Sequence, residues 1–117
     1  MLVAADRNDR RAWADHRVRL ELGVVPVTTA PVVAQVSRSA GQVQLRRFLR
    51  GCHVAPFETD QAHDVGALLG QAGTSDVVDA HLVITAAGSA STIWTANPKD
   101  LRRLAGQLPV PIGIRRM

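Results

Sequence analysis

The sequence contains no tyrosine, two tryptophans, two phenylalanines and a single cysteine in 117 residues. Because aromatic residues make up only 3%, the core has to be built mainly from Val, Leu, Ile and Ala. Proteins that bind single strands on aromatic platforms need exposed rings, so this composition argues against that class. The lone Cys52 excludes an intrachain disulfide and a zinc site built on cysteines. We expect Trp13 and Trp94 to be anchors in the core or in an interface.

Long apolar runs are also missing, and none approaches the roughly 20 residues that a membrane-spanning helix needs. The start of the chain lacks the basic and apolar regions of a signal peptide. We therefore expect a cytoplasmic protein without a membrane partner. The length suits a single domain over residues 1–117, and a composition with 46% hydrophobic and 21% charged residues is that of a chain that buries a core.

The charge of the chain is strongly positive, with a formal value of +4 and a sequence pI near 11.0. Such a balance suits an anionic partner such as nucleic acid, although a solubilising surface charge explains it equally well. All the basic residues except Lys99 are arginines, whose planar guanidinium group can contact phosphate bidentately. Our candidates for nucleic-acid contact are Arg46, Arg47 and Arg50, for which a solvated helix face is the alternative.

Glycine and proline divide the chain into helical and strand-like segments. Hydrophobic spacing and capping residues predict helices over 9–22, from Thr29, over 42–50, from Thr59 to about Gln71, over 76–87 and over 97–105. Short strands are predicted over 24–28, 53–57, 91–95 and 111–115. This alternation predicts an α/β fold with a mostly parallel sheet and helices on both faces. Sites in such folds gather beyond the carboxyl ends of the strands, here near residues 28–35, 57–60 and 95–100.

Acidic residues stand out in two short stretches. Asp76 and Asp79 are three residues apart on one predicted helix face, and Asn97 and Asp100 come after the end of a strand. Carboxylates grouped in this way can hold Mg²⁺ or Mn²⁺, which activate water and offset the charge of a phosphodiester being cut. Alternatively, Asp76 and Asn97 are helix N-caps, with the other two acids favoured by the helix dipole. The two interpretations are compatible.

Two segments resemble a known family. Residues 74–104, TSDVVDAHLVITAAGSASTIWTANPKDLRRL, resemble the C-terminal half of a VapC-type PIN-domain ribonuclease, a toxin of type II toxin–antitoxin pairs. The likeness lies in the Asp79-Ala80 helix start and in the apolar strand that ends in Thr95-Ala96-Asn97, followed by Asp100-Leu101. Residues 23–38, GVVPVTTAPVVAQVSR, resemble the family's second strand and the helix after it.

This resemblance implies a PIN-like three-layer sandwich and a Mg²⁺-dependent endoribonuclease that cuts structured RNA. It also implies a small antitoxin as inhibitory partner and a possible homodimer. Asp79 would be the third family acid, and Asn97 would occupy the fourth position with Asp100 close behind. Asp76 would be an auxiliary acid. Gln35 stands where many members carry a glutamate in the helix after the second strand.

The sequence departs from the family pattern at three of its acid positions. The first strand of the family ends in an Asp, and residues 1–5 resemble the segment just after that Asp, so this strand and its ligand are missing. Gln35 and Asn97 are neutral amides and weaker ligands than carboxylates. We therefore expect weak binding of Mg²⁺ or Mn²⁺ and poor nuclease activity. The alternative is a catalytically inactive PIN-like module that binds a protein partner or nucleic acid.

The remaining candidate residues receive structural interpretations. The four histidines share no zinc-ligand spacing, and we expect each of them to be a half-buried helix or strand residue. His81 is the one nearest to the acids, and we expect a packing role for it. Cys52 and His53 are adjacent on a strand, so their side chains point to opposite faces and do not form a nucleophile–base pair. We expect Asp60 and Asp64 to be solvated on a helix surface.

Overall fold

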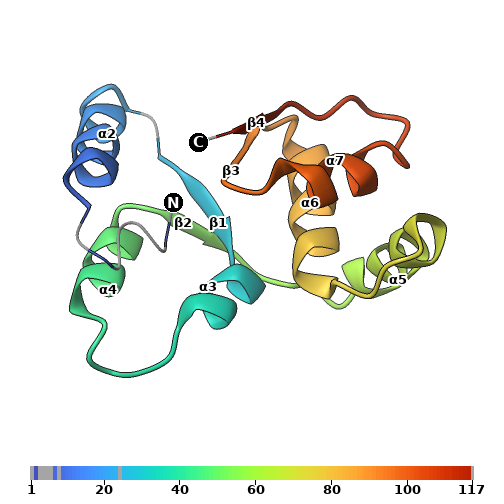
Figure 1. The fold of residues 1–117 in the computed structure, drawn as a ribbon, viewed down its shortest axis with the longest axis horizontal. Helices are drawn as coiled ribbons and strands as arrows, with labels where there is room; N and C mark the ends of the chain where they lie inside the picture. The colour runs from blue at the N-terminus through green and yellow to red at the C-terminus, as the bar shows by residue number, and fades with distance from the viewer. Residues whose placement is uncertain (1, 3–6, 8, 24, 117) are drawn as a thin grey trace. The chain divides into compact units, whose positions relative to one another are not determined.

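The structure is a computed structural model that describes residues 2, 7, 9–23 and 25–116. The chain divides into two compact units, an N-terminal unit (Met1–Pro56) and a C-terminal unit (Phe57–Met117). The described residues form six helices and four short strands (Figure 1). Each unit contains three of these helices and one parallel pair of strands. The predicted α/β class and the predicted parallel pairing are therefore confirmed, but the described strands form two two-stranded sheets and not the single sheet that we predicted.

The N-terminal unit follows the predicted order of elements. It consists of α2 (Arg10–Glu21), β1 (Val27–Thr29), α3 (Ala30–Val36), α4 (Val43–Arg50) and β2 (His53–Ala55). Strands β1 and β2 pair in parallel, with Val27 beside His53.

Side-chain caps fix two helix starts in this unit. The Asp9 carboxylate accepts a hydrogen bond from the Ala12 amide at 3.0 Å, at the start of α2. The Thr29 hydroxyl accepts one from the Val32 amide at 3.4 Å, at the start of α3. Gly23 comes after α2 with a φ of +78°, a conformation that glycine adopts without strain. The predicted helix start at Thr29 is confirmed, and α2 ends within the predicted range of 9–22.

The core of the N-terminal unit is small and centres on Phe48. This side chain is fully buried together with Leu45, and Leu2 packs against them. The His16 ring stacks on Phe48 with a centroid separation of 4.0 Å, and Trp13 meets Phe48 edge-on at 5.2 Å. Few apolar side chains thus stabilise this unit, and an aromatic cluster supplies much of their contact.

The C-terminal unit has the larger core. Its elements are α5 (Gln61–Ala72), α6 (Val77–Ser89), β3 (Ile93–Thr95), α7 (Pro98–Ala105) and β4 (Ile114–Arg116). Helix α6 contacts both α5 and α7 (Figure 1). Strands β3 and β4 pair in parallel, with Ile93 beside Ile114. The buried side chains of this unit are Val65, Leu68, Ala72, Ala80, Val83, Ala86, Ile93, Leu101, Leu104 and Ile114.

Two predicted helix ends are wrong. We predicted Thr59 as the cap of α5, but Asp60 occupies that position without a side-chain cap bond. The Gln61 side chain instead accepts a hydrogen bond from the Glu58 amide at 2.8 Å, which satisfies a donor just before the helix. Helix α6 continues past Gly88, and Ala90 takes the left-handed conformation with a φ of 53°.

The predictions for residues 1–5 concern a part of the chain that, apart from Leu2, lies outside the described residues. Val24, the first residue of a predicted strand, lies outside them as well, and β1 begins at Val27. None of the described helices combines the length and the apolar character that crossing a membrane requires.

Candidate functional site

The candidate site begins at the first turn of α6. Asp76 is the N-cap, and its Oδ1 accepts a hydrogen bond from the Asp79 amide at 3.0 Å. The capping interpretation is thus confirmed. It does not exclude a chemical role, because a cap uses one carboxylate oxygen and leaves the other lone pairs available. The cap also holds the Asp76 carboxylate close to that of Asp79.

The second part of the site is the start of α7, directly after β3. Asn97 is the N-cap by position, but its side chain makes no cap hydrogen bond. Its backbone amide instead donates to the Thr95 Oγ1 at 3.1 Å. Pro98 is fully buried and begins the helix, and Asp100 lies exposed in the first turn. The capping interpretation of the Asn97 side chain is therefore wrong, so its side-chain oxygen is not used by the helix.

The electrostatic centre of the site is Asp79. Burial raises the pKa of this carboxyl from 3.8 to about 6, and the charges of Asp76 and Asp100 and a hydrogen bond to the Asp76 side chain contribute to that rise. The influence of Asp100 indicates that the starts of α6 and α7 bring these acids within electrostatic reach of each other. We refer to Asp76, Asp79 and Asp100, which are linked by these electrostatic effects, as the acid cluster.

No basic side chain forms an ion pair with this cluster within the part of the chain that the structure describes. A cation does lie beside the start of α7, where the Arg116 Nη1 donates to the carbonyl oxygen of Ala96 at 3.2 Å. This bond ties the end of β4 to the turn that carries Asn97. We did not predict this role of Arg116 from the sequence. It depends on the register of the two strands, which places Arg116 beside Thr95.

Carboxylate and amide oxygens are the donors that Mg²⁺ and Mn²⁺ prefer. An acid cluster in which the pKa of Asp79 is raised, and with which no described basic side chain forms an ion pair, fits such an ion by its charge and chemistry. Three His, Cys, Asp or Glu side chains do not converge on one point anywhere among the described residues. The acids are thus grouped but do not form a complete ligand shell.

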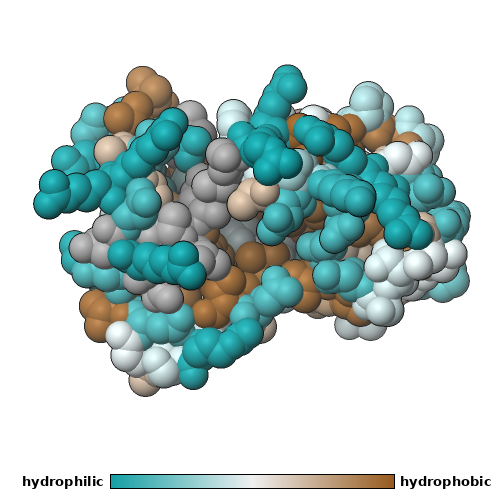
Figure 2. Space-filling model, viewed as in Figure 1, coloured by the Kyte–Doolittle hydropathy of each residue, from teal (hydrophilic) through white to brown (hydrophobic). Residues whose placement is uncertain are grey.

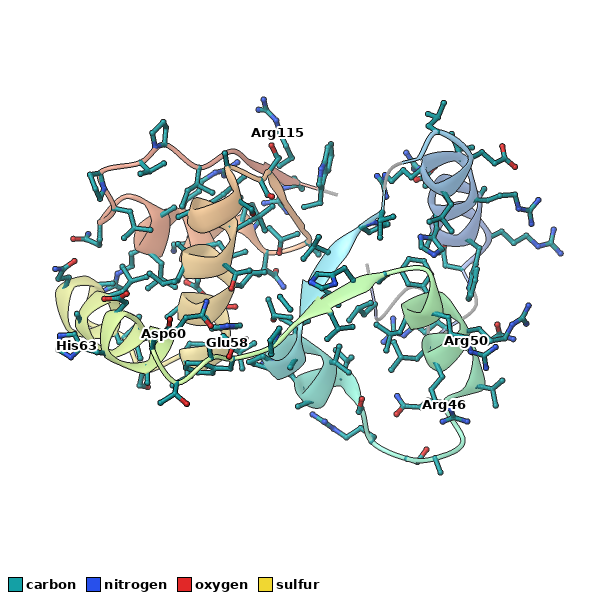
Figure 3. All side chains as sticks on the ribbon, turned by 180° about the vertical axis from the view of Figure 1, so that it is seen from behind. Arg46, Arg50, Glu58, Asp60, His63 and Arg115 are labelled. Atoms are coloured by element: carbon teal, nitrogen blue, oxygen red, sulfur yellow. The ribbon has the colours of Figure 1, made fainter. Side chains whose placement is uncertain are left out.

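The other predicted site residues lie in the N-terminal unit. Gln35 is exposed on α3. Arg46 and Arg50 are exposed on α4 (Figure 3), and the Arg47 guanidinium lies 5.7 Å from the centre of the Trp13 ring. Hydrophilic residues also cover much of the visible face of α2 (Figure 2). The three arginines therefore share one basic helix, in a different unit from the acids.

Two residues that we set aside have packing roles. His81 is fully buried, stacks on Phe57 with a centroid separation of 4.5 Å, and has its Nε2 3.1 Å from the Gln61 Oε1. Burial raises the pKa of Cys52 to about 11, so its thiol stays protonated at neutral pH and is a poor nucleophile. The prediction that neither residue is catalytic therefore agrees with the environment of each.

Of the two positions expected for Trp94, core or interface, the structure excludes the core. Trp94 is 51% exposed, whereas its neighbour Ile93 is buried. The alternation of side chains along a strand explains the difference, because residues 93 and 94 of β3 must point to opposite faces.

Comparison of the chain with models of known protein families, with curated proteins and with solved structures gave no match.

Proposed function

We propose that this protein is a metal-dependent endoribonuclease of the PIN type, resembling the VapC toxins, with an acid cluster centred on Asp79. The observation that carries the proposal is the group of three carboxyls at the starts of α6 and α7, which accompanies a pKa of about 6 at Asp79. Carboxylates close together repel each other and destabilise a fold in which they have only a structural role. Three carboxyls placed at the starts of two helices, with the pKa of one of them raised, are therefore typical of a site that binds a cation.

Each residue of the cluster has a role in this proposal. Asp79 and Asp100 would hold a Mg²⁺ or Mn²⁺ ion with the Asn97 side-chain oxygen, and Asp76 would share its charge and orient Asp79. The bound ion would supply an activated water and offset charge on the phosphodiester. A proton held between Asp76 and Asp79 competes with a cation, so affinity for the ion should rise as the pH rises through about 6.

The distribution of charge supports an RNA substrate. Residues 1–56 contain nine arginines and four acidic residues, whereas residues 57–117 contain five basic and six acidic residues. A basic unit suits contact with the phosphate backbone, and Arg46, Arg47 and Arg50 are our candidates for it. We further propose the PIN-like sandwich as the fold and an antitoxin protein and a second copy of the chain as partners.

A second candidate function is a PIN-like module that binds RNA or protein without cutting. Gln35 and Asn97 favour it, because an amide contributes no negative charge to a cation site. For the same reason we expect this chain to bind the ion weakly under either proposal.

A cleavage assay separates the two candidates. Structured RNA is incubated with Mg²⁺ and this chain, and with the chain carrying Asp79→Asn. Asp64→Asn is the matched control, because Asp64 is an exposed acid in the first turn of α5.

We expect slow, Mg²⁺-dependent cleavage by this chain and a loss of roughly 100-fold or more with Asp79→Asn. If this chain cuts no RNA, the enzyme proposal is wrong and the binding module remains. If Asp79→Asn cuts as fast as Asp64→Asn, the enzyme proposal stands and the site assignment is wrong.

A further inference from the structure

The outer face of the β3–β4 pair is a surface that neither the core nor the acid cluster uses. Ile93 and Ile114 are 6% and 8% exposed and face the core of the C-terminal unit. Side chains alternate along a strand, so Trp94 and Arg115 both lie on the opposite face. The two residues are partners in the parallel register and therefore lie side by side. Both are exposed, Trp94 by 51%.

The chemistry of this face is that of an aromatic ring beside a cation. Figure 3 shows Arg115 on β4 with its side chain directed away from the helices of the unit. Among the described residues, no carboxylate pairs with Arg115. An exposed indole next to an unneutralised guanidinium fits a planar base stacked on the ring, with a phosphate beside the cation. A purely apolar protein segment would leave that charge without a partner.

The face lies close along the chain to the candidate acid site. Two residues separate Trp94 from Asn97, and the three Cα–Cα steps between them span at most about 11 Å even in a fully extended chain. The Arg116 bond to the Ala96 carbonyl fixes the intervening turn. A nucleotide stacked on Trp94 would therefore lie within a few nucleotides of a phosphate held at Asp79 and Asp100.

We propose that Trp94 and Arg115 form a binding site for an unpaired nucleotide of single-stranded or looped RNA, with the base on the indole and a phosphate on the guanidinium. This proposal rests on the proposed function for its substrate class and adds a preference for unpaired RNA, because a base inside a duplex cannot stack on a side chain. Trp94 is the more exposed of the two exposed aromatic side chains among the described residues, because Phe57 is 37% exposed and stacks on His81.

Binding in EDTA tests this site separately from cleavage. Trp13 is replaced by Phe, so that Trp94 is the only tryptophan, and its emission is followed while a single-stranded RNA of about 12 nucleotides, within the range of single-strand site sizes, is added. Fluorescence anisotropy of the labelled RNA gives the affinity of the same chain. We expect the emission to be quenched in step with binding, and a duplex of the same sequence to quench it far less.

Substitutions give the size of the effect. Trp94→Ala should weaken binding of the single strand about 5- to 100-fold, whereas Trp94→Phe should retain most of the affinity. Arg115→Gln should lower the slope of log affinity against log salt by about 0.7, the value for one phosphate of a single strand. Val110→Ala is the control, because Val110 is an apolar residue of the same unit that is 44% exposed.

Unchanged emission at saturating RNA, or an affinity of Trp94→Ala equal to that of Val110→Ala, would overturn the proposal and leave the face to a protein partner. A different result would show that the nuclease proposal has failed: RNA binding would be weakened by Trp94→Ala, but the protein would not cleave RNA in the presence of Mg²⁺. If cleavage is lost in Asp79→Asn but RNA affinity is unchanged in Trp94→Ala, the nucleotide site alone is rejected.

Discussion

Replacing Asp79 with asparagine should stabilise the protein at alkaline pH and have little effect at pH 4. The folded-state pKa of about 6 lies above the ordinary value of 3.8, so between these values the folded protein holds a proton that the unfolded chain has released. The contribution of Asp79 to stability is therefore greatest below about pH 4 and falls as the pH rises through about 6. An asparagine side chain at this position is neutral at every pH and avoids this loss.

The size of the effect is set by the pKa shift. At about 1.36 kcal/mol per pKa unit, a rise from 3.8 to about 6 corresponds to about 3 kcal/mol. Asp79 is only partly buried, and solvent screening reduces this to about 1–2 kcal/mol. The introduced side-chain amide can also donate to the Asp76 carboxylate, as the protonated acid does. We therefore expect Asp79→Asn to raise the free energy of unfolding by about 1–2 kcal/mol at pH 8.

Urea titrations at pH 4 and pH 8 measure this difference. In a Trp13→Phe background the emission of Trp94 reports the unfolding of the unit that contains Asp79. Asp64→Asn, which removes an exposed charge from the same unit, is the control and should change little at either pH. The reasoning is refuted if Asp79→Asn is no more stable than the parent at pH 8, or if the gain is the same at both pH values.

Two further predictions concern a glycine and a cap. In Gly51→Ala, the new Cβ would lie 2.5 Å from the His16 Nε2, and that ring is held in a buried stack, so we expect a loss of about 1–3 kcal/mol in thermal or urea unfolding. Gly70→Ala, where a Cβ meets nothing within 4 Å, should gain about 0.5–1 kcal/mol, and equal effects at the two glycines would contradict the packing at His16. Asp76→Ser keeps a capping oxygen and removes a charge, so the pKa of Asp79 should fall below about 6 but stay above 3.8, since burial remains. A carbon-detected NMR titration of the Asp79 carboxyl gives this value, and an unchanged pKa would show that Asp76 does not act on Asp79.

Local signals in the sequence predicted most helix positions correctly. Thr29 and Asp76 each make the predicted side-chain bond at a helix start, because short polar side chains satisfy the free amides there. The parallel pairing was also predicted, since the segments between strands were long enough for crossover helices. The prediction failed at the end of α6, which continues beyond the predicted residue 87 to Ser89 and has Ala90 as its left-handed C-cap.

The candidate site was predicted in part. The spacing of Asp76 and Asp79 predicted their proximity, but the pKa shift of Asp79 depends on burial and on Asp100 of another helix, which spacing does not reveal. Composition did not decide between a core and an interface position for Trp94. Its outward position depends on which face of β3 meets the core, and the buried Ile93 next to it was the available signal.

The most direct test of the metal site is a titration with Mn²⁺ at pH 8, followed by the loss of the free-ion signal in electron paramagnetic resonance. We predict one weak site with a dissociation constant on the order of 10⁻³ M, which is lost in Asp79→Asn, is retained in Asp64→Asn, and weakens as the pH falls below about 6. Binding that is the same in Asp79→Asn and Asp64→Asn, or no binding at any pH, would contradict the account.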